Sequence, residues 1–186
     1  MYTVKVRNLE LGSGTPAVCI PNVGKTKEEI LSLTEQYRSM SMDLMEWRVD
    51  WFEGVEDTQA VLDVLSGVRE KLGDTPLLFT FRTKKEGGVH EMDTTAYVSL
   101  NKAVAATKLA DLIDVEIFTG DGVVSDLISA IHASGTKVVA SNHDFDKTPA
   151  KSDILYRLRK MQDMGAGIPK IGVMPRSKRD GLGLLS

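Results

Sequence analysis

The stretch "KVVASNHDF", residues 137–145, begins as an apolar run and ends in a group of polar side chains. A strand that leads into a helix cap would explain one such stretch. The pattern recurs along the chain, however, and segments with helical spacing separate the apolar runs. Turn residues flank each of these apolar runs, which span residues 17–24, 43–52, 76–83, 111–118, 137–145 and 169–176.

Strands that alternate with helices indicate right-handed βαβ units and a parallel sheet. A dinucleotide-binding fold is disfavoured, because "PNVGKTKEE" (21–29) has one glycine where a G-x-G-x-x-G turn is expected. Polar residues at the carboxyl ends of many strands are instead typical of a (β/α)8 TIM barrel. About six of eight βα units are visible. We therefore predict an α/β chain with a single barrel domain, residues 1–186, that is incomplete at its C-terminus.

The composition is typical of a soluble globular protein, with 26% charged and 42% hydrophobic residues. The net charge of −3 argues against nucleic acid as a partner. No run of about 18 apolar residues predicts a membrane span, and the N-terminal segment has no apolar core of a secretory signal. Because Cys19 has no second cysteine to pair with, we expect a reducing compartment, the cytoplasm.

Lys170 and His143 are the candidate catalytic residues. Lys170 stands in the apolar run "GIPKIGVMP" (167–175), where it faces either solvent on an edge strand or a cavity. In a cavity it would lose its proton more easily, because burial disfavours the ammonium, and would then attack carbonyl groups. His143 would face the same cavity as general base and acid. The alternative is a strand-end cap supported by Asp144 and Asn142.

Three charged residues of an earlier run extend the candidate site. Glu46, Arg48 and Asp50 alternate in "MEWRVDWF" (45–52) and would share one face of a strand. Helices should cover a parallel sheet, so three charges on one face require a polar pocket. Arginine in such a pocket suits an anionic, hydroxylated substrate.

Two further candidates stand in "FTFRTKKEGG" (79–88), where Arg82 ends a strand and Glu86 follows in a loop. A carboxylate at this position could orient the imidazole of His143 and increase its basicity. For Glu86 alone, a solvated loop residue is the simpler interpretation.

Several of these motifs together resemble one known family. The segments "EWRVDWF", "PLLFTFRTKKEGG", "DVEIFTG", "SNHDFDKTP" and "RLRKMQDMGAGIPKIGVMP" agree in order and spacing with the type I 3-dehydroquinate dehydratases, class I aldolase-like barrels. The resemblance covers essentially the whole chain, including the opening "TVKVRNLELGSGTP". It implies a TIM-barrel lyase that dehydrates 3-dehydroquinate to 3-dehydroshikimate in the shikimate pathway of aromatic amino acid biosynthesis.

The resemblance also implies the catalytic roles. Lys170 would form a Schiff base with the substrate ketone, His143 would move the proton, and Glu86 would orient His143. The iminium is itself an electron sink, so no metal and no cofactor is expected. The expected partner is the anionic small molecule 3-dehydroquinate, and we expect the chain to form a homodimer.

The substrate contacts that the resemblance implies come from the earlier strands. Glu46 and Arg82 would hold substrate hydroxyls, and Arg48 would line the same pocket. The family usually has a serine at the position of Pro21, at the end of the first strand.

Two other interpretations stay open. A metal-dependent barrel enzyme would use Glu46, Asp50, Glu116 and His143, which are suitable ligand types, but it leaves Lys170 unexplained. In the second interpretation the chain is a truncated, catalytically impaired fragment of the same family. It would lack the units expected after "RSKRDGLGLLS" and keep two unpaired sheet edges.

Overall fold

The structure is a computed structural model that describes residues 3–185. Its strands are β1 (Val4–Val6), β2 (Leu9–Leu11), β3 (Cys19–Asn22), β4 (Leu44–Arg48), β5 (Leu77–Thr80), β6 (Leu112–Glu116), β7 (Lys137–Asp144) and β8 (Ile168–Val173). Its α-helices are α1 (Lys27–Arg38), α2 (Thr58–Leu72), α3 (Thr94–Thr107), α4 (Asp121–Ala133), α5 (Lys151–Asp163) and α6 (Lys178–Leu185). Two short 3-10 helices are η1 (Val49–Trp51) and η2 (Lys84–Glu86). Within this range, no helix has the length and apolar character that a membrane crossing requires.

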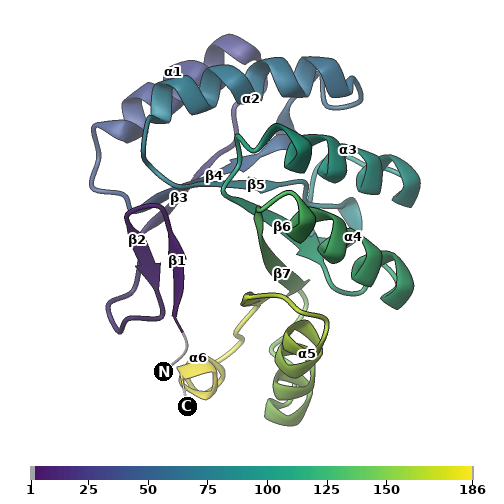
Figure 1. Ribbon diagram of the computed structural model, residues 1–186. Helices are drawn as coiled ribbons and strands as arrows, with labels where there is room; N and C mark the ends of the chain where they lie inside the picture. The colour runs from purple at the N-terminus through teal and green to yellow at the C-terminus, as the bar shows by residue number, and fades with distance from the viewer. Residues whose placement is uncertain (1–2, 186) are drawn as a thin grey trace.

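Strands β3 to β8 form one parallel sheet, and each strand pairs with the next one along the chain. The sheet curls, and α1 to α5 follow one another in an arc around its outer side (Figure 1). Among the described residues β3 and β8 do not pair with each other, so the sheet is an open half-barrel. The predicted α/β barrel class, with six βα units in this chain, is confirmed.

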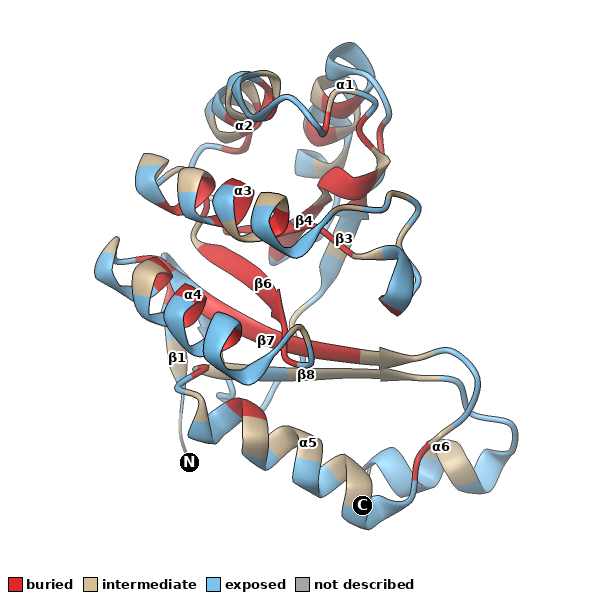
Figure 2. Ribbon diagram, turned by 90° about the vertical axis from the view of Figure 1, so that its right-hand side faces the viewer, coloured by how far each residue is buried: buried red, intermediate tan, exposed pale blue. Residues whose placement is uncertain are grey.

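The main core lies between the sheet and the surrounding helices. Apolar residues at helical spacing on α2, α3 and α4 are buried against the outer side of the sheet. Figure 2 shows this as buried colour on the inward faces of the helices and along β6. Trp47 on β4 packs edge-on against Phe79 on β5, with ring centroids 5.6 Å apart. β8 at the edge of the sheet is less buried than β6 in its middle.

An N-terminal hairpin covers one end of the half-barrel. β1 and β2 pair antiparallel, and Val6 is buried with residues near the amino ends of the parallel strands, Leu44 and Leu112 among them. Arg7 and Arg69 both donate to the carboxylate of Asp111, at 2.6 and 2.8 Å, and so tie the hairpin to the barrel. Because the hairpin covers the amino end, a site for a small molecule is left at the carboxyl end of the strands.

The helix that follows the first barrel strand begins as its sequence predicts. The side chain of Thr26 accepts a hydrogen bond from the backbone N–H of Glu29 at 3.2 Å. The Glu29 carboxylate reaches back to the backbone N–H of Lys25 at 2.8 Å, one residue earlier than in the usual capping box. Two otherwise unpaired N–H groups are thus satisfied, and they fix where α1 starts.

Candidate active site

Lys170 points into the half-barrel. Its Nζ lies 3.1 Å from Asp114 Oδ2 on β6 and 3.3 Å from Glu46 Oε1 on β4. Contacts to two other strands across the curl of the sheet are possible only from the inner side. Of the two environments considered for this lysine, the structure therefore places it in the polar interior, although its side chain keeps 33% exposure at the open side.

The charge state of Lys170 differs from the prediction. Burial by itself lowers the pKa of the ammonium, but the carboxylates of Asp114 and Glu46 outweigh it and raise the pKa. The expectation that this lysine loses its proton more easily is therefore wrong for the resting site, because a cation between two carboxylates keeps its proton. Before it attacks a carbonyl, the ammonium must pass a proton to another group.

Arg82 is the centre of a buried ion cluster at the end of β5. Its guanidinium lies 2.9 Å from Asp114 Oδ2 and from Glu116 Oε1, and it donates to Ser141 Oγ at 2.9 Å. Burial acts to lower the pKa of Arg82, but Asp114 and Glu116 prevail and raise it above its ordinary value. With 3% exposure, the side chain is a fixed positive charge inside the protein.

Asp114 is the shared partner of Lys170 and Arg82. It is fully buried, and its second oxygen accepts a hydrogen bond from Ser141 Oγ. Burial would raise the pKa of the carboxyl, but Arg82 and Lys170 hold it well below its usual range, so Asp114 stays ionised. Asp114 was not among the predicted site residues. The signal was its position two residues before Glu116 in "LIDVE", which places both carboxylates on one face of the strand.

His143 and Glu86 form a hydrogen-bonded pair. His143 Nδ1 lies 3.0 Å from Glu86 Oε2, and the same oxygen accepts the backbone N–H of His143 at 3.0 Å. Glu86 comes from η2 and is 7% exposed, so it is not the solvated loop residue of the simpler interpretation. Because a carboxylate only accepts, the pair favours the ring proton on Nδ1 and leaves Nε2 as an acceptor.

The neighbours of His143 restrict its ring. Phe145 stacks on the imidazole with centroids 6.0 Å apart and planes 12° from parallel. Gly172 on β8 lies so close that a Cβ there would be 2.5 Å from His143 Cδ2. Gly87, at φ +87°, leaves the space that the Phe145 ring occupies. The absence of two side chains thus lets the stacked pair fit against the sheet.

The charged residues of β4 do not all share one face. Glu46 Oε1 accepts from Thr80 Oγ1 at 2.7 Å, but β4 ends at Arg48. Asp50 lies in η1, where the chain turns. Its buried carboxylate accepts hydrogen bonds from Nε and Nη2 of Arg48 at 2.8 and 2.9 Å. The predicted common face therefore holds for Glu46 and Arg48 alone, because the strand is too short to include Asp50.

The four residues of the metal-dependent interpretation, Glu46, Asp50, Glu116 and His143, each have a different charged partner. Glu46 is beside Lys170, and the other three bind separate arginine or carboxylate groups. Within residues 3–185, no three or more His, Cys, Asp or Glu side chains are grouped so that they could hold a metal ion. The geometry thus favours the lysine-based interpretation.

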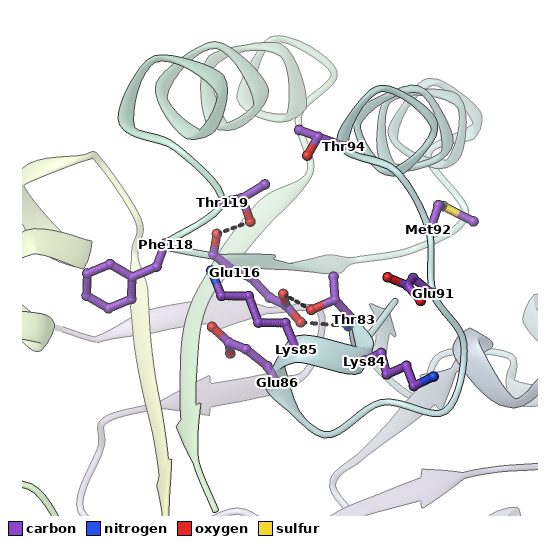
Figure 3. Close-up of a pocket in the computed structure, with 10 residues that line it drawn as sticks. All are labelled: Thr83, Lys84, Lys85, Glu86, Glu91, Met92, Thr94, Glu116, Phe118 and Thr119. Carbon is purple, nitrogen blue, oxygen red and sulfur yellow. Dashed lines mark hydrogen bonds between the residues drawn. The ribbon is translucent and has the colours of Figure 1, made fainter.

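A separate cavity of about 210 Å³ lies between η2 and the start of α3. Figure 3 shows Glu116 in its wall, held by Thr83, whose backbone N–H and hydroxyl donate to it at 2.8 and 2.7 Å. Burial raises the pKa of Glu116, although Arg82 opposes the rise. Of the three predicted catalytic residues, Glu86 lines this cavity, whereas Lys170 and His143 do not.

Residues 18–186 match the family model described as type I 3-dehydroquinase. The chain belongs to the type I 3-dehydroquinase family. This membership confirms the predicted family and its function as a hydro-lyase, a 3-dehydroquinate dehydratase of the shikimate pathway. The motifs quoted from the sequence were therefore sufficient to identify the dehydroquinases.

Curated dehydroquinases are similar over the whole chain. The 3-dehydroquinate dehydratase of Syntrophotalea carbinolica is 49% identical over 185 residues, 100% of this chain and 73% of the relative. That of Clostridioides difficile is 45% identical over 182 residues, 98% of this chain and 71% of the relative. The chain thus spans a little under three quarters of the length of these dehydroquinases.

Solved dehydroquinase structures have the same fold. The type I 3-dehydroquinate dehydratase from Clostridium difficile, crystallised with covalently modified comenic acid, superposes with a TM-score of 0.96 at 45% identity and covers 98% of this chain and 72% of that one. The enzyme from Geobacillus kaustophilus gives a TM-score of 0.95 at 34% identity, over 98% and 71% of the two chains. The half-barrel is therefore a part of the dehydroquinase fold that this chain reproduces closely.

Proposed function

We propose that this chain dehydrates 3-dehydroquinate through a Schiff base on Lys170, with the His143–Glu86 pair as acid–base catalyst. One observation carries the proposal: Lys170 points into the half-barrel between two carboxylates, and His143 follows on the neighbouring strand. Lys170 is in register with Ser141, two residues before His143. Strands about 4.8 Å apart with a rise of about 3.3 Å per residue put the two Cα atoms about 8 Å apart. Both side chains can then act on adjacent carbons of one small substrate.

The first step forms the iminium. Glu46, 3.3 Å from Lys170 Nζ, takes one proton from the ammonium, and the free amine attacks the substrate ketone. The carbonyl oxygen leaves as water with the returned proton, and Nζ keeps a single positive charge. Because Asp114 is already ionised beside Nζ, it serves as the counter-ion of the ammonium before the reaction and of the iminium afterwards.

The second step is the elimination. His143 Nε2 takes the C2 proton of the substrate, and the electron pair moves into the iminium to give a neutral enamine. The pair then returns as the substrate hydroxyl departs, and the protonated imidazole gives its proton to that oxygen, which leaves as water. Hydrolysis of the new iminium releases the ketone product and restores Lys170.

Substrate binding is assigned to the remaining charged residues. Glu46 holds a hydroxyl beside the ketone in this proposal, which is supported by the contact of its carboxylate with Lys170 Nζ. Arg82 and Arg48 already bind Asp114, Glu116 and Asp50, so their contacts to substrate come in addition to these pairs. In β3, Pro21 is in register with Glu46 and offers no donor where the family usually has a serine.

The setting of the enzyme belongs to the same proposal. We place it in the reducing cytoplasm, since Cys19 is unpaired, and expect it to form a homodimer. Light scattering on the purified chain measures its oligomeric state. The alternative is that this 186-residue chain is a catalytically impaired half-barrel. A turnover assay with 3-dehydroquinate distinguishes an active enzyme from an impaired one.

Borohydride trapping tests the covalent step. Reduction in the presence of 3-dehydroquinate should fix a ligand mass on the peptide that contains Lys170, and Lys170→Ala should abolish the adduct. Lys178→Ala, at an exposed lysine of α6, is the matched control and should trap normally. An adduct on another lysine, or none from a folded sample that binds the substrate, would contradict the assignment.

His143→Ala tests the second step. It should still form the trapped adduct but lose turnover by a factor of about 10² to 10⁴, the usual range for lost acid–base catalysis. His132→Ala, on α4, is the control and should keep full activity. Normal turnover by His143→Ala would mean that the histidine is only a strand-end cap.

A further inference from the structure

Two residues outside the catalytic pair are connected to it by hydrogen bonds. Asn142 precedes His143 on β7, and its Nδ2 donates to Glu86 Oε1 at 2.9 Å. Its Oδ1 accepts from Arg157 Nη1 at 2.7 Å, and Arg157 belongs to α5 on the outer side of the sheet. A continuous chain of hydrogen bonds thus runs from an outer helix through the sheet to the imidazole.

The donor and acceptor types allow this chain in one direction only. A guanidinium has donors and no acceptor, and a carboxylate has acceptors and no donor. The amide of Asn142 is the one group in between that does both. Arg157 therefore requires the amide oxygen on its side, and this turns the amide N–H₂ toward Glu86.

Arg157 is itself held in place. Its other nitrogen, Nη2, lies 2.7 Å from Asp153 Oδ2 one helical turn earlier, and 4.0 Å from Asp144 Oδ2. Its side chain is 16% exposed, so solvent competes little for its donors. Arg157 is thus pre-oriented before it meets Asn142, which makes it the fixed end of the chain.

The fixed amide decides how Glu86 meets the histidine. With Oε1 bound to Asn142, Oε2 is left to accept both the backbone N–H and Nδ1 of His143. The guanidinium of Arg82 also faces this carboxylate, with Nη1 3.6 Å from Glu86 Oε2. If the amide turned over, its oxygen would face Oε1, and the repulsion would displace the carboxylate from the imidazole.

We propose that Arg157 is a positioning residue for proton transfer: by fixing the Asn142 amide it holds Glu86, and through Glu86 it keeps the His143 proton on Nδ1 with Nε2 free as the base. The inference rests on the proposed function, since it takes His143 as the acid–base catalyst. It extends the machinery from the catalytic pair to a residue of α5, a helix on the outer side of the sheet.

The tautomer of His143 is the direct test, because it can be measured without turnover. Long-range ¹H–¹⁵N correlation spectra of ¹⁵N-histidine-labelled protein distinguish a proton on Nδ1 from one on Nε2, and His143→Ala assigns the signals among His90, His132 and His143. At alkaline pH, where imidazoles are neutral, the unmodified chain should show the Nδ1–H form. Arg157→Leu should shift His143 toward Nε2–H.

Three variants complete the test. Arg157→Lys keeps a cationic donor and should restore the Nδ1–H signal, and Arg159→Leu, at an exposed arginine of the same helix, should not change it. Asn142→Asp keeps the shape of the side chain but faces Glu86 with a second carboxylate, so it should lose the Nδ1–H form as well. Where turnover is measured, kcat of Arg157→Leu and of Asn142→Asp should fall about tenfold, the lower end of the range for lost hydrogen-bond partners of metal-binding histidines, with little change in KM.

An unchanged Nδ1–H signal in folded Arg157→Leu overturns the inference. If Arg157→Leu does not fold, an unchanged Nδ1–H signal in Asn142→Asp overturns the inference. Failure of the proposed function has a different signature, normal turnover by His143→Ala or no adduct on Lys170, and neither result depends on Arg157.

Discussion

Asp114 places a permanent negative charge beside Lys170. It is fully buried and bound to Arg82, and it faces Lys170 together with Glu46. The two carboxylates raise the pKa of Lys170 against the effect of burial. In the proposed mechanism this charge is useful after the attack, because the iminium keeps the positive charge of the ammonium. The cost is a lower fraction of free amine at neutral pH.

This balance predicts a shift in pH dependence. For unmodified protein the initial rate of borohydride trapping should rise with pH up to the raised pKa of Lys170, above the ordinary value of about 10.4. In Asp114→Asn, Glu46 still raises the pKa of Lys170 and Arg82 still lowers it, but the contribution of Asp114 is lost, so the rise should move to lower pH. Mass spectrometry of the adduct over a pH series measures it. Asp146→Asn, at an exposed aspartate, should leave the profile unchanged, and an unshifted Asp114→Asn profile would remove Asp114 from this role.

Gly172 should be required for catalysis because a side chain at this position would collide with the His143 ring. The requirement does not come from backbone strain. A methyl group at this position would meet the His143 ring at 2.5 Å and push it away from Glu86. Gly172→Ala should therefore lower kcat at least tenfold, a consequence of misplaced proton transfer, while borohydride trapping on Lys170 remains. Gly122→Ala, on α4 with open space around it, is the matched control. Full activity of Gly172→Ala would show that the ring can act from another position.

At the scale of elements, the start of α1 offers a measurable local contribution. Thr26 caps the helix by accepting the N–H of Glu29. Thr26→Ala should lower the free energy of unfolding by about 1 kcal/mol, seen as a melting temperature about 2–4 °C lower for a chain of this size. Thr95→Ala lies in the first turn of α3, where Asp93 supplies the cap, so it should have a smaller effect. Equal effects of the two variants would argue against a cap at Thr26.

The elements with regular periodicity were predictable from the sequence. The six barrel strands and five helices follow from apolar runs and helical spacing, because each must bury one face against the other layer. The hairpin of β1 and β2 was not predicted, since its strands are three residues each and pair with one another rather than with the sheet. Arg157 was missed for a different reason: on an outer helix it has the pattern of an ordinary solvent-exposed residue, and only the folded sheet brings it to Asn142.

At the scale of the molecule, the half-barrel has two edge strands, β3 and β8. In residues 3–185, β3 pairs only with β4, and β8 only with β7. Each therefore presents a row of backbone groups that are free to pair with another strand. The hairpin closes the amino end of the half-barrel but pairs with neither edge. The side of the site that lies beyond Lys170 is thus open.

These edges predict association of the 186-residue chain. Strand pairing between copies would satisfy the edge groups and cover apolar surface, so light scattering should show a mass above the monomer that increases with protein concentration. Thermal melting should broaden on dilution, because β8, which is only partly buried, loses its partner first. A cooperative monomer with full turnover at low concentration would show that the open edges are tolerated. In that case the charged residues on β4 to β8 would suffice for catalysis without any strand between β8 and β3.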